Sequence, residues 1–118
     1  MKKLSLETLR QFSGTEKWYR HSLVRKVLYT DGIQYLAEYG EAYWLIDEIA
    51  FAQAKPRITV EEFQTWTLTV NEDSSASLKC DDGNKNTLFI KRIPFTDFLL
   101  PEIKIYCINN VILLPSEY

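Results

Sequence analysis

The 118-residue sequence predicts a single α+β domain, residues 1–118, with N-terminal helices packed on a mostly antiparallel sheet of four or five strands. Apolar residues recur at helical spacing in the first half of the chain and alternate with polar residues from residue 63 onward. The length is that of one ordinary domain, and 46% hydrophobic residues are sufficient for a core without metal or disulfide staples.

Three segments have the features of helices. Ser5 and Thr30 are suitable side-chain caps for helices at 4–12 and 31–39. Gly40 suits the left-handed residue that ends a helix. A third helix is expected at 41–54, with a wide apolar face, and Pro56 is expected to close it.

The segment 17–29 is ambiguous, because Val24, Val27 and Leu28 fit a helix while the residues around Tyr19 and Leu28 fit two short strands. We favour the two short strands. Their pairing partners are not evident from the sequence.

Strands dominate the second half of the chain. Alternating patterns predict strands that end near Val70 and Cys80, with turns at 71–75 and 81–84. A third strand, 88–93, has an imperfect pattern that suggests a bulge.

The last two strands form a predicted hairpin, 103–114. Asn109-Asn110 suits a two-residue turn, because Asn tolerates positive φ. A two-residue turn pairs Ile108 with Val111, Cys107 with Ile112 and Ile105 with Leu114. Both faces of this hairpin are apolar, so the core can cover only one, and the other needs a second layer, a partner protein or a second copy of the chain.

Charge and hydropathy exclude several classes of protein. No apolar run approaches the ~20 residues of a membrane span, and the N-terminus lacks the apolar core of a signal peptide, so we expect a cytoplasmic protein without membrane partners. The net charge of -2 is too small to indicate a nucleic-acid binder by itself. The charge is uneven, because residues 1–60 carry nine Lys/Arg against seven Asp/Glu and residues 61–118 carry five against nine.

No cofactor or metal site is predicted. Cys80 and Cys107 lack the spacing of a zinc or redox site, so we interpret them as buried thiols, with a bridge or metal site as the alternative. His21 is the only histidine, which excludes a His-pair metal site. The stretch 81–84, with Asp73 in the previous turn, has the oxygen ligands of a Ca²⁺ site but not the spacing of an EF-hand, and hairpin turns use the same residues.

The first candidate site is a segment in which cations and aromatics alternate without an acid. Its residues are Lys17, Trp18, Tyr19, Arg20, His21, Arg25 and Lys26. Such a segment suits phosphate contacts and base stacking, and the alternative is a solvated face with its aromatics in the core. A third hypothesis is a small enzyme in which Tyr19 and His21 act as an acid-base pair assisted by Arg20.

The second candidate site is a concentration of aromatics around Gly40. Its residues are Tyr35, Tyr39, Tyr43 and Trp44. They are either core or the anchors of an interface, because Tyr and Trp are enriched at binding hot spots. These four residues and the aromatics of the first site, Trp18 and Tyr19, make a set of six. If the protein works by docking, at least two of the six should be exposed and should lie close together.

The chain also resembles a known family. The strings that carry the resemblance are WYRH (18–21), YTDGIQYLAE (29–38), AYWLIDEIA (42–50), WTLTV (66–70), CDDGN (80–84), FTDF (95–98) and LLPSEY (113–118). They resemble an uncharacterised bacterial domain family, frequent in cyanobacteria and often carried on plasmids, phages or other mobile elements. The resemblance implies a cytoplasmic bacterial protein and attaches no activity or site residue to it.

Three functions are therefore open. We expect a small protein-binding module rather than an enzyme. Such a module would act as an inhibitor or accessory factor encoded by a mobile element, for example against a defence system. The alternative is nucleic-acid or nucleotide binding through 17–26. A small enzyme without a recognisable motif is third.

Overall fold

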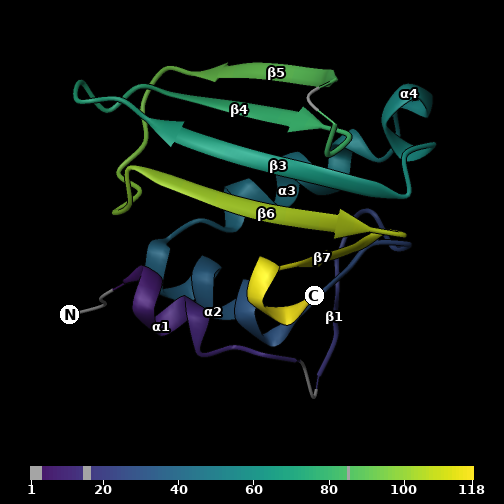
Figure 1. The fold of residues 1–118 in the computed structure, drawn as a ribbon, viewed down its shortest axis with the longest axis horizontal. Coiled ribbons are helices and arrows are strands. Elements are labelled where there is room, and N and C mark those ends of the chain that lie inside the picture. The colour runs from purple at the N-terminus through teal and green to yellow at the C-terminus, as the bar shows by residue number, and fades with distance from the viewer. Residues whose placement is uncertain (1–3, 15–16, 85) are drawn as a thin grey trace.

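The computed structural model describes residues 4–14, 17–84 and 86–118, and it has two layers (Figure 1). A seven-stranded sheet has helix α3 behind it, and its other face, turned toward the viewer, is open. The elements in chain order are α1 (Leu6–Arg10), β1 (Tyr19–Arg20), β2 (Leu28–Tyr29), α2 (Asp31–Gly40), α3 (Tyr43–Ala52), α4 (Pro56–Thr59), β3 (Phe63–Val70), β4 (Ala76–Asp81), β5 (Thr87–Ile93), β6 (Glu102–Ile108), β7 (Val111–Leu113) and the 3₁₀ helix η1 (Pro115–Glu117). Within the described part of the chain, no helix has the length and apolar character needed to cross a membrane.

The α+β class is confirmed, but the sheet has seven strands and not four or five. The strand order is β1-β2-β7-β6-β3-β4-β5, and every pair is antiparallel except β2–β7. The ambiguous segment 17–29 supplies β1 and β2, which join the sheet when the Leu28 N–H donates to the Asn110 carbonyl at 2.9 Å. Strands of two residues are too short to produce a periodic pattern. The helices are also not purely N-terminal, because β1 and β2 precede α2 and η1 ends the chain.

The last hairpin is formed as expected up to its end. Asn109 and Asn110 have φ of 50° and 68°, and Ile108 and Cys107 pair with Val111 and Ile112. The expected pairing of Ile105 with Leu114 is absent, because β7 ends at Leu113 and the chain turns into η1.

The ends of the three predicted helices are corrected. The segments 4–12 and 41–54 shorten to α1 and α3, and the left-handed residue after α2 is Glu41, with φ 51°, not Gly40. Gly40 is needed for space, because a Cβ there would lie 2.9 Å from Leu4 and 3.0 Å from Phe98. Pro56 does not merely stop α3, because it begins α4 at a position where no backbone N–H is required.

The core lies between the helices and the covered face of the sheet. Its largest side chain is Trp66, which is fully buried on β3. Other core side chains come from α2, α3 and the strands, namely Ile33, Leu36, Leu45, Ile49, Leu68, Leu78, Ile105 and Ile112.

A buried amide pair ties α3, α4 and β3 together inside this core. The Gln53 Nε2 donates to Gln64 Oε1 and the Gln64 Nε2 donates to Gln53 Oε1, both at 2.8 Å. Each amide also donates to a backbone carbonyl, of Ile49 at 3.1 Å and Ile58 at 3.0 Å. The Trp66 indole N–H donates to Gln64 Oε1 at 3.0 Å. The polar atoms of both amides are therefore satisfied without water.

A carboxylate near the C-terminus fastens the last turn to α2. Glu117 accepts hydrogen bonds from the Thr30 hydroxyl at 2.6 Å, the Leu114 N–H at 2.9 Å and the Gly32 N–H at 3.1 Å. A negative charge at the N-terminus of a helix is stabilised by the helix dipole. A Cβ on Gly32 would lie 2.6 Å from this carboxylate, which explains the glycine.

We predict that Gln64→Leu lowers the free energy of unfolding by about 2–4 kcal/mol, because it leaves the Gln53 amide and the Trp66 N–H buried without partners. Urea denaturation followed by tryptophan fluorescence measures the change. Gln11→Leu, at an exposed glutamine, is the control and should change the stability by less than about 0.5 kcal/mol. The double variant Gln53→Leu/Gln64→Leu should recover part of the loss, and a Gln64→Leu protein as stable as wild type would contradict the role of the pair.

Candidate functional site

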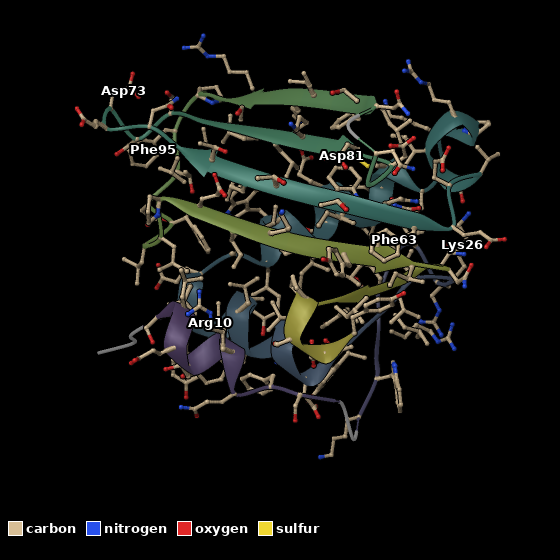
Figure 2. All side chains as sticks on the ribbon, viewed as in Figure 1. Arg10, Lys26, Phe63, Asp73, Asp81 and Phe95 are labelled. Atoms are coloured by element: carbon tan, nitrogen blue, oxygen red, sulfur yellow. The ribbon has the colours of Figure 1, made fainter. Side chains whose placement is uncertain are left out.

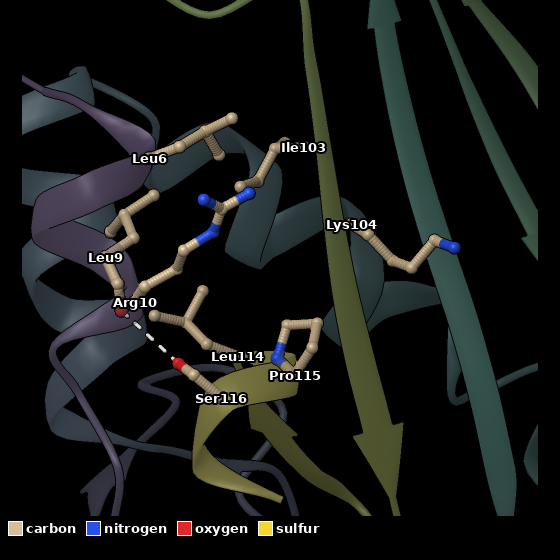
Figure 3. Close-up of a pocket in the computed structure, with 8 residues that line it drawn as sticks. All are labelled: Leu6, Leu9, Arg10, Ile103, Lys104, Leu114, Pro115 and Ser116. Carbon is tan, nitrogen blue, oxygen red and sulfur yellow. Dashed lines mark hydrogen bonds between the residues drawn. The ribbon is translucent and has the colours of Figure 1, made fainter.

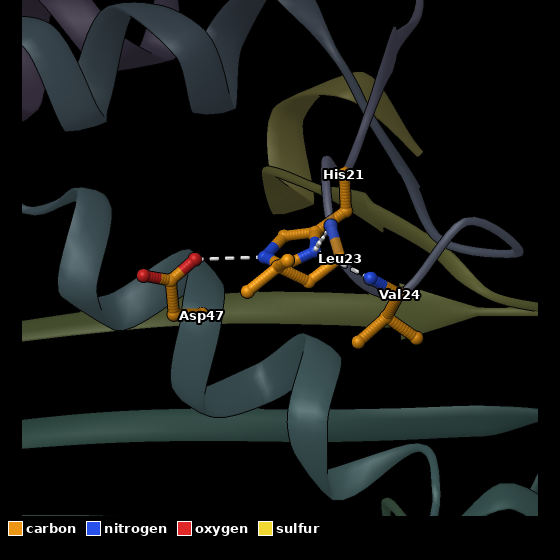
Figure 4. Close-up of polar contacts among 4 residues, drawn as sticks. All are labelled: His21, Leu23, Val24 and Asp47. Atoms are coloured by element: carbon orange, nitrogen blue, oxygen red, sulfur yellow. Dashed lines mark hydrogen bonds and ion pairs between the residues drawn. The ribbon is translucent and has the colours of Figure 1, made fainter.

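The ribbon formed by β1 and β2 is fastened to α3 by His21 (Figure 4). The Nδ1 of His21 accepts hydrogen bonds from the backbone N–H groups of Leu23 at 3.2 Å and Val24 at 2.9 Å. Because Nδ1 is an acceptor, the ring proton is on Nε2, which donates to Asp47 Oδ1 at 2.7 Å. His21 is 4% exposed. Its two nitrogens are thus engaged in holding the loop, and this arrangement leaves neither free for the acid-base role of the enzyme hypothesis.

Near the His21–Asp47 hydrogen bond, α3 presents large side chains to solvent. Tyr43, Asp47 and Phe51 are four residues apart and form one stripe along the helix. Tyr43 is 43% and Phe51 44% exposed, and the Phe51 ring lies edge-on to His21 at 5.6 Å. Leu23, on the adjacent loop, is 73% exposed.

Two tyrosines of the ribbon continue this surface. Tyr19 and Tyr29 stack with ring centroids 5.4 Å apart. Burial raises the pKa of Tyr29, and the charges of Tyr43, Tyr19 and Asp47 raise it further, so these groups gather around Tyr29. We call the set the α3–ribbon surface: Tyr19, His21, Leu23, Tyr29, Tyr43, Asp47 and Phe51.

The α3–ribbon surface joins residues from both predicted candidate sites. Tyr19 and His21 belong to the first, Tyr43 to the second. The other four members were not predicted, namely Leu23, Tyr29, Asp47 and Phe51. The four-residue spacing of Tyr43, Asp47 and Phe51 was nevertheless visible in the sequence. Without the position of the core, nothing indicated that this stripe faces outward.

The cations of the first candidate site are exposed but partly engaged. The residues Lys17, Arg20, Arg25 and Lys26 all reach solvent, and Trp18 is 55% exposed. The Arg20 guanidinium donates to the Arg25 carbonyl. The Lys26 ammonium donates to the Gln53 carbonyl at 3.1 Å, beside the negative end of α3. These bonds hold the ribbon in place and occupy hydrogen-bond donors of Arg20 and Lys26, while both side chains keep their positive charge.

The aromatics of the second candidate site are divided between core and surface. Tyr35 stacks on Tyr39 at 4.3 Å and Trp44 packs partly buried against the core. The Tyr43 hydroxyl donates to Glu38 at 3.2 Å. Tyr39 is 37% exposed, so it joins Trp18 and Tyr43 as the exposed members of the six aromatics. The expectation that at least two are exposed is confirmed, and the expectation that the exposed ones lie close together stays a prediction.

A second surface lies on the open face of the sheet (Figure 2). A shallow hollow of about 740 Å³ is lined by Phe63, Thr65, Thr67, Lys79, Asp81, Gly83, Glu102, Lys104 and Tyr106. At its edge the rings of Phe63 and Tyr106 are 4.8 Å apart, and Tyr118 contacts both at 5.5 and 5.9 Å.

The second apolar face of the last hairpin lies here. Its residues, Tyr106, Ile108, Val111 and Leu113, are all half-buried. Among the described residues, Phe63 and Tyr118 contact the Tyr106 ring and provide partial cover from the same chain. That a second copy covers this face stays a prediction, which light scattering of the purified protein tests.

The cavity between α1, β6 and η1 is too small for most ligands (Figure 3). Its volume is about 150 Å³, below the ~300 Å³ of ordinary small-molecule sites. It is lined mainly by apolar side chains that include Leu6, Leu9 and Ile103, and the Ser116 hydroxyl closes one side by donating to the Leu9 carbonyl at 3.3 Å. We interpret it as a gap in packing.

The turns at 71–75 and 81–84 do not bring their carboxylates together, as a shared Ca²⁺ site would require. Asp73 and Asp81 lie at opposite ends of β4, so Asp73 is not near the second turn (Figure 2). Hydrogen bonds from Ser75 hold the pKa of Asp73 below its usual value, and those from Asn86 and Asn84 do the same for Asp82. Both carboxylates thus accept hydrogen bonds within their own turns. Among the described residues, no group of three or more His, Cys, Asp or Glu is arranged for a metal.

Cys80 and Cys107 are buried free thiols. They lie on β4 and β6, on either side of β3, so about two strand spacings, ~10 Å, separate them. A disulfide requires Cα atoms within ~7 Å and is therefore excluded. Burial raises the pKa of each thiol to about 12.

We predict that both thiols resist alkylation in the folded protein. With a pKa of about 12, against 9.0 ordinarily, each forms about a thousandfold less thiolate at pH 8. The thiols ionise at a lower pH in the unfolded chain than in the folded protein. The free energy of unfolding should therefore keep its full value below pH 9 and decrease as the pH rises from 9 toward 12. Iodoacetamide labelling with and without urea measures the first effect. Equal labelling rates in the two conditions would show that the thiols are not buried.

We predict that His21→Ala loosens the ribbon and destabilises the protein by about 1–3 kcal/mol, because two loop N–H groups lose their acceptor. Hydrogen exchange by mass spectrometry should show faster exchange in residues 22–27. Ser22→Ala, an exposed neighbour, is the control and should leave exchange unchanged. Unchanged protection of 22–27 in His21→Ala would mean that the ring does not hold the loop.

Comparison with known proteins places this chain in a family without assigning it a function. A family model described as a family of unknown function, DUF6876, matches residues 3–118. Curated proteins and solved structures give no match. The match covers nearly the whole chain, and the protein belongs to the DUF6876 family.

Proposed function

We propose that this protein is a small binding module that docks on a partner protein through the α3–ribbon surface. One observation carries the proposal: a core helix, α3, turns a stripe of aromatic side chains outward and a buried histidine locks a second chain segment beside it. The partner is expected to offer an apolar groove bordered by carboxylates.

Exposed anchors support this proposal. Tyr43, Phe51 and Leu23 leave between 43% and 73% of their surfaces in water. Large side chains of this kind bury much area at a low cost in rotamer entropy and dominate the energetics of interfaces. Tyr43 and Phe51 do not face the core, because they lie on the side of α3 opposite the buried Leu45 and Ile49.

The surface is also preorganised. The His21–Asp47 hydrogen bond and the Tyr19–Tyr29 stack fix the ribbon before any partner arrives. Binding to a fixed surface avoids the entropic cost of ordering a loop, which otherwise subtracts from affinity.

Charge indicates the chemistry of the partner. The ribbon adds Arg20, Arg25 and Lys26 to one border of the surface, and all three reach solvent. Opposite charge on a partner would steer association and fix its orientation.

Nucleic-acid binding through 17–26 is the second candidate, because Trp18 is 55% exposed and the exposed Arg20 follows two residues later. Two features favour a protein partner instead. The Arg20 and Lys26 side chains already bond to backbone carbonyls, and Tyr19 stacks internally on Tyr29.

The biological role is proposed from the sequence. Its resemblance to a bacterial family often carried on mobile elements makes host proteins, including components of defence systems, the first partners to test. An inhibitor or accessory factor encoded by a mobile element is the role that such a module would have.

The test compares capture of host proteins by wild type and by the double variant Tyr43→Ala/Phe51→Ala. Quantitative mass spectrometry should identify a partner whose recovery falls at least tenfold in the variant, because its anchors are removed. Calorimetry with the purified partner should show the same loss. Val60→Ala and Leu99→Ala, at exposed apolar residues outside the α3–ribbon surface, are the controls and should retain the partner.

Equal recovery by wild type and the double variant would contradict the proposal. Binding of a single-stranded oligonucleotide that weakens steeply with salt, and that is lost in Arg20→Ala/Arg25→Ala/Lys26→Ala but not in Tyr43→Ala/Phe51→Ala, would establish the second candidate instead.

A further inference from the structure

We propose that His21 is a pH-sensitive switch of the α3–ribbon surface, in which a proton on Nδ1 releases the loop at 22–24 while the ring stays bound to Asp47. Figure 4 shows the four residues concerned, His21, Leu23, Val24 and Asp47. The effect on docking rests on the proposed function, whereas the movement of the loop does not.

The first step is the role of Nδ1. It accepts hydrogen bonds from the backbone N–H groups of Leu23 at 3.2 Å and Val24 at 2.9 Å. In the described ranges, these two N–H groups have no backbone acceptor outside the helices and strands. A proton on Nδ1 turns the acceptor into a donor, so three N–H groups would point toward one another. The closed loop therefore cannot keep its hydrogen bonds to a protonated ring.

The second step is burial, which makes this conflict costly. His21 is 4% exposed, and the Phe51 ring lies edge-on to it at 5.6 Å. A buried donor that loses its acceptor is destabilising, because it gave up water on folding and gains nothing in return. Opening the loop gives water to the Nδ1 proton and to both backbone N–H groups. The open loop therefore binds the proton more favourably than the closed loop.

The third step is the other nitrogen, which keeps the ring in place. Nε2 donates to Asp47 Oδ1 at 2.7 Å, and it carries a proton in the neutral and in the charged ring. A neighbouring carboxylate favours the charged ring. Protonation thus strengthens the contact of His21 with α3, and the loop is the part that gives way.

The remaining bonds of the ribbon limit how far it opens. The His21 N–H donates to the Val27 carbonyl at 2.9 Å, and Val27 is fully buried. The Lys26 ammonium donates to the Gln53 carbonyl at 3.1 Å. None of these bonds involves the imidazole. Opening is therefore confined to the tip of the loop, which carries the exposed Leu23 of the α3–ribbon surface.

The other ionisable groups of this region keep their charge while histidine gains a proton. They are Tyr43 on α3, Tyr19 and Arg20 on β1, Arg25 and Lys26 on the loop, and Tyr29 on β2. Tyrosine, arginine and lysine ordinarily titrate at about pH 10 or above, and an imidazole gains its proton between about pH 8 and 5. The three cations oppose a further positive charge on the ring, as the two N–H groups do. The chain has one histidine, so a response in this range is assigned to a single residue.

Nuclear magnetic resonance tests the switch without a partner, because the imidazole signals come from one residue. At about pH 8 the ring should carry its proton on Nε2, and toward about pH 5 both nitrogens should be protonated. The amide signals of Leu23 and Val24 should move in the same transition. The protection factor of the Val24 amide against hydrogen exchange, corrected for the intrinsic effect of pH, should fall about tenfold or more. Protection within α3 should change less than about twofold, which distinguishes loop opening from unfolding.

Three variants locate the effect at Nδ1. In His21→Asn the amide oxygen can accept from the two loop N–H groups but gains no proton, so Val24 protection should stay constant between about pH 8 and 5. Asp47→Asn keeps an acceptor for Nε2 and removes the charge, and its loop should still open. Ser22→Ala, at an exposed neighbour, is the control and should respond as wild type does. If His21→Asn does not fold, Asp47→Asn and the titration of the wild-type imidazole still decide the question.

The consequence for docking is measured with the partner of the proposed function. Its affinity for wild type should fall about tenfold or more from pH 8 to pH 5, because Leu23 leaves the surface. The affinity for His21→Asn should change less than about twofold over the same range, which also controls for groups on the partner. The loop measurements need no partner, so failure of the proposed function and failure of the switch are distinguishable.

Three outcomes would overturn the inference. The first is an imidazole that gains its second proton while the protection of Val24 is unchanged. The second is a loop that opens in His21→Asn as it does in wild type, which would assign the response to another group. The third is a partner whose affinity for wild type is the same with the loop closed and open, which would remove the regulatory role.

Discussion

The reciprocal amide pair of Gln53 and Gln64 fixes the position of α3 on the sheet, and the rest of the structure depends on it. It joins the last turn of α3 to the start of β3 in a place where an unpaired amide would be costly. Since it fixes the rotation of α3, it determines which side chains are buried. Leu45 and Ile49 enter the core, and Tyr43, Asp47 and Phe51 remain outside.

That rotation then positions the ribbon of β1 and β2. Asp47 faces outward at the height where His21 can reach it, and Lys26 meets the free carbonyl at the end of the same helix. Two short strands with little pairing of their own are thus ordered by side-chain contacts to α3. The polar groups of this region form a hydrogen-bonded border around exposed aromatic rings, which supports the proposed docking role.

A one-sided cover is the other constraint on the fold. Helices bury only one face of the sheet, so the opposite face carries Thr, Lys, Asp and Glu over β3, β4 and β6, and aromatic rings where the last hairpin lies. Glu117 closes the chain against α2, so that the C-terminal turn brings Tyr118 onto the open face. The open face of the sheet thereby has two surfaces of different chemistry, the polar hollow and the aromatic cluster.

The sequence by itself determined the class of the fold, the positions of α2 and α3, the long strands and the turn at Asn109-Asn110. These features are local, because periodicity, capping residues and positive φ depend on neighbours in the chain. Only the tertiary structure decided that β1 and β2 extend the sheet through β7, that Gly40 serves packing against Leu4 and Phe98, and that Tyr19 stacks on Tyr29. Those outcomes depend on contacts between segments far apart in sequence, where neither the pairing partner nor the outward side of a mostly apolar helix is encoded in a local pattern.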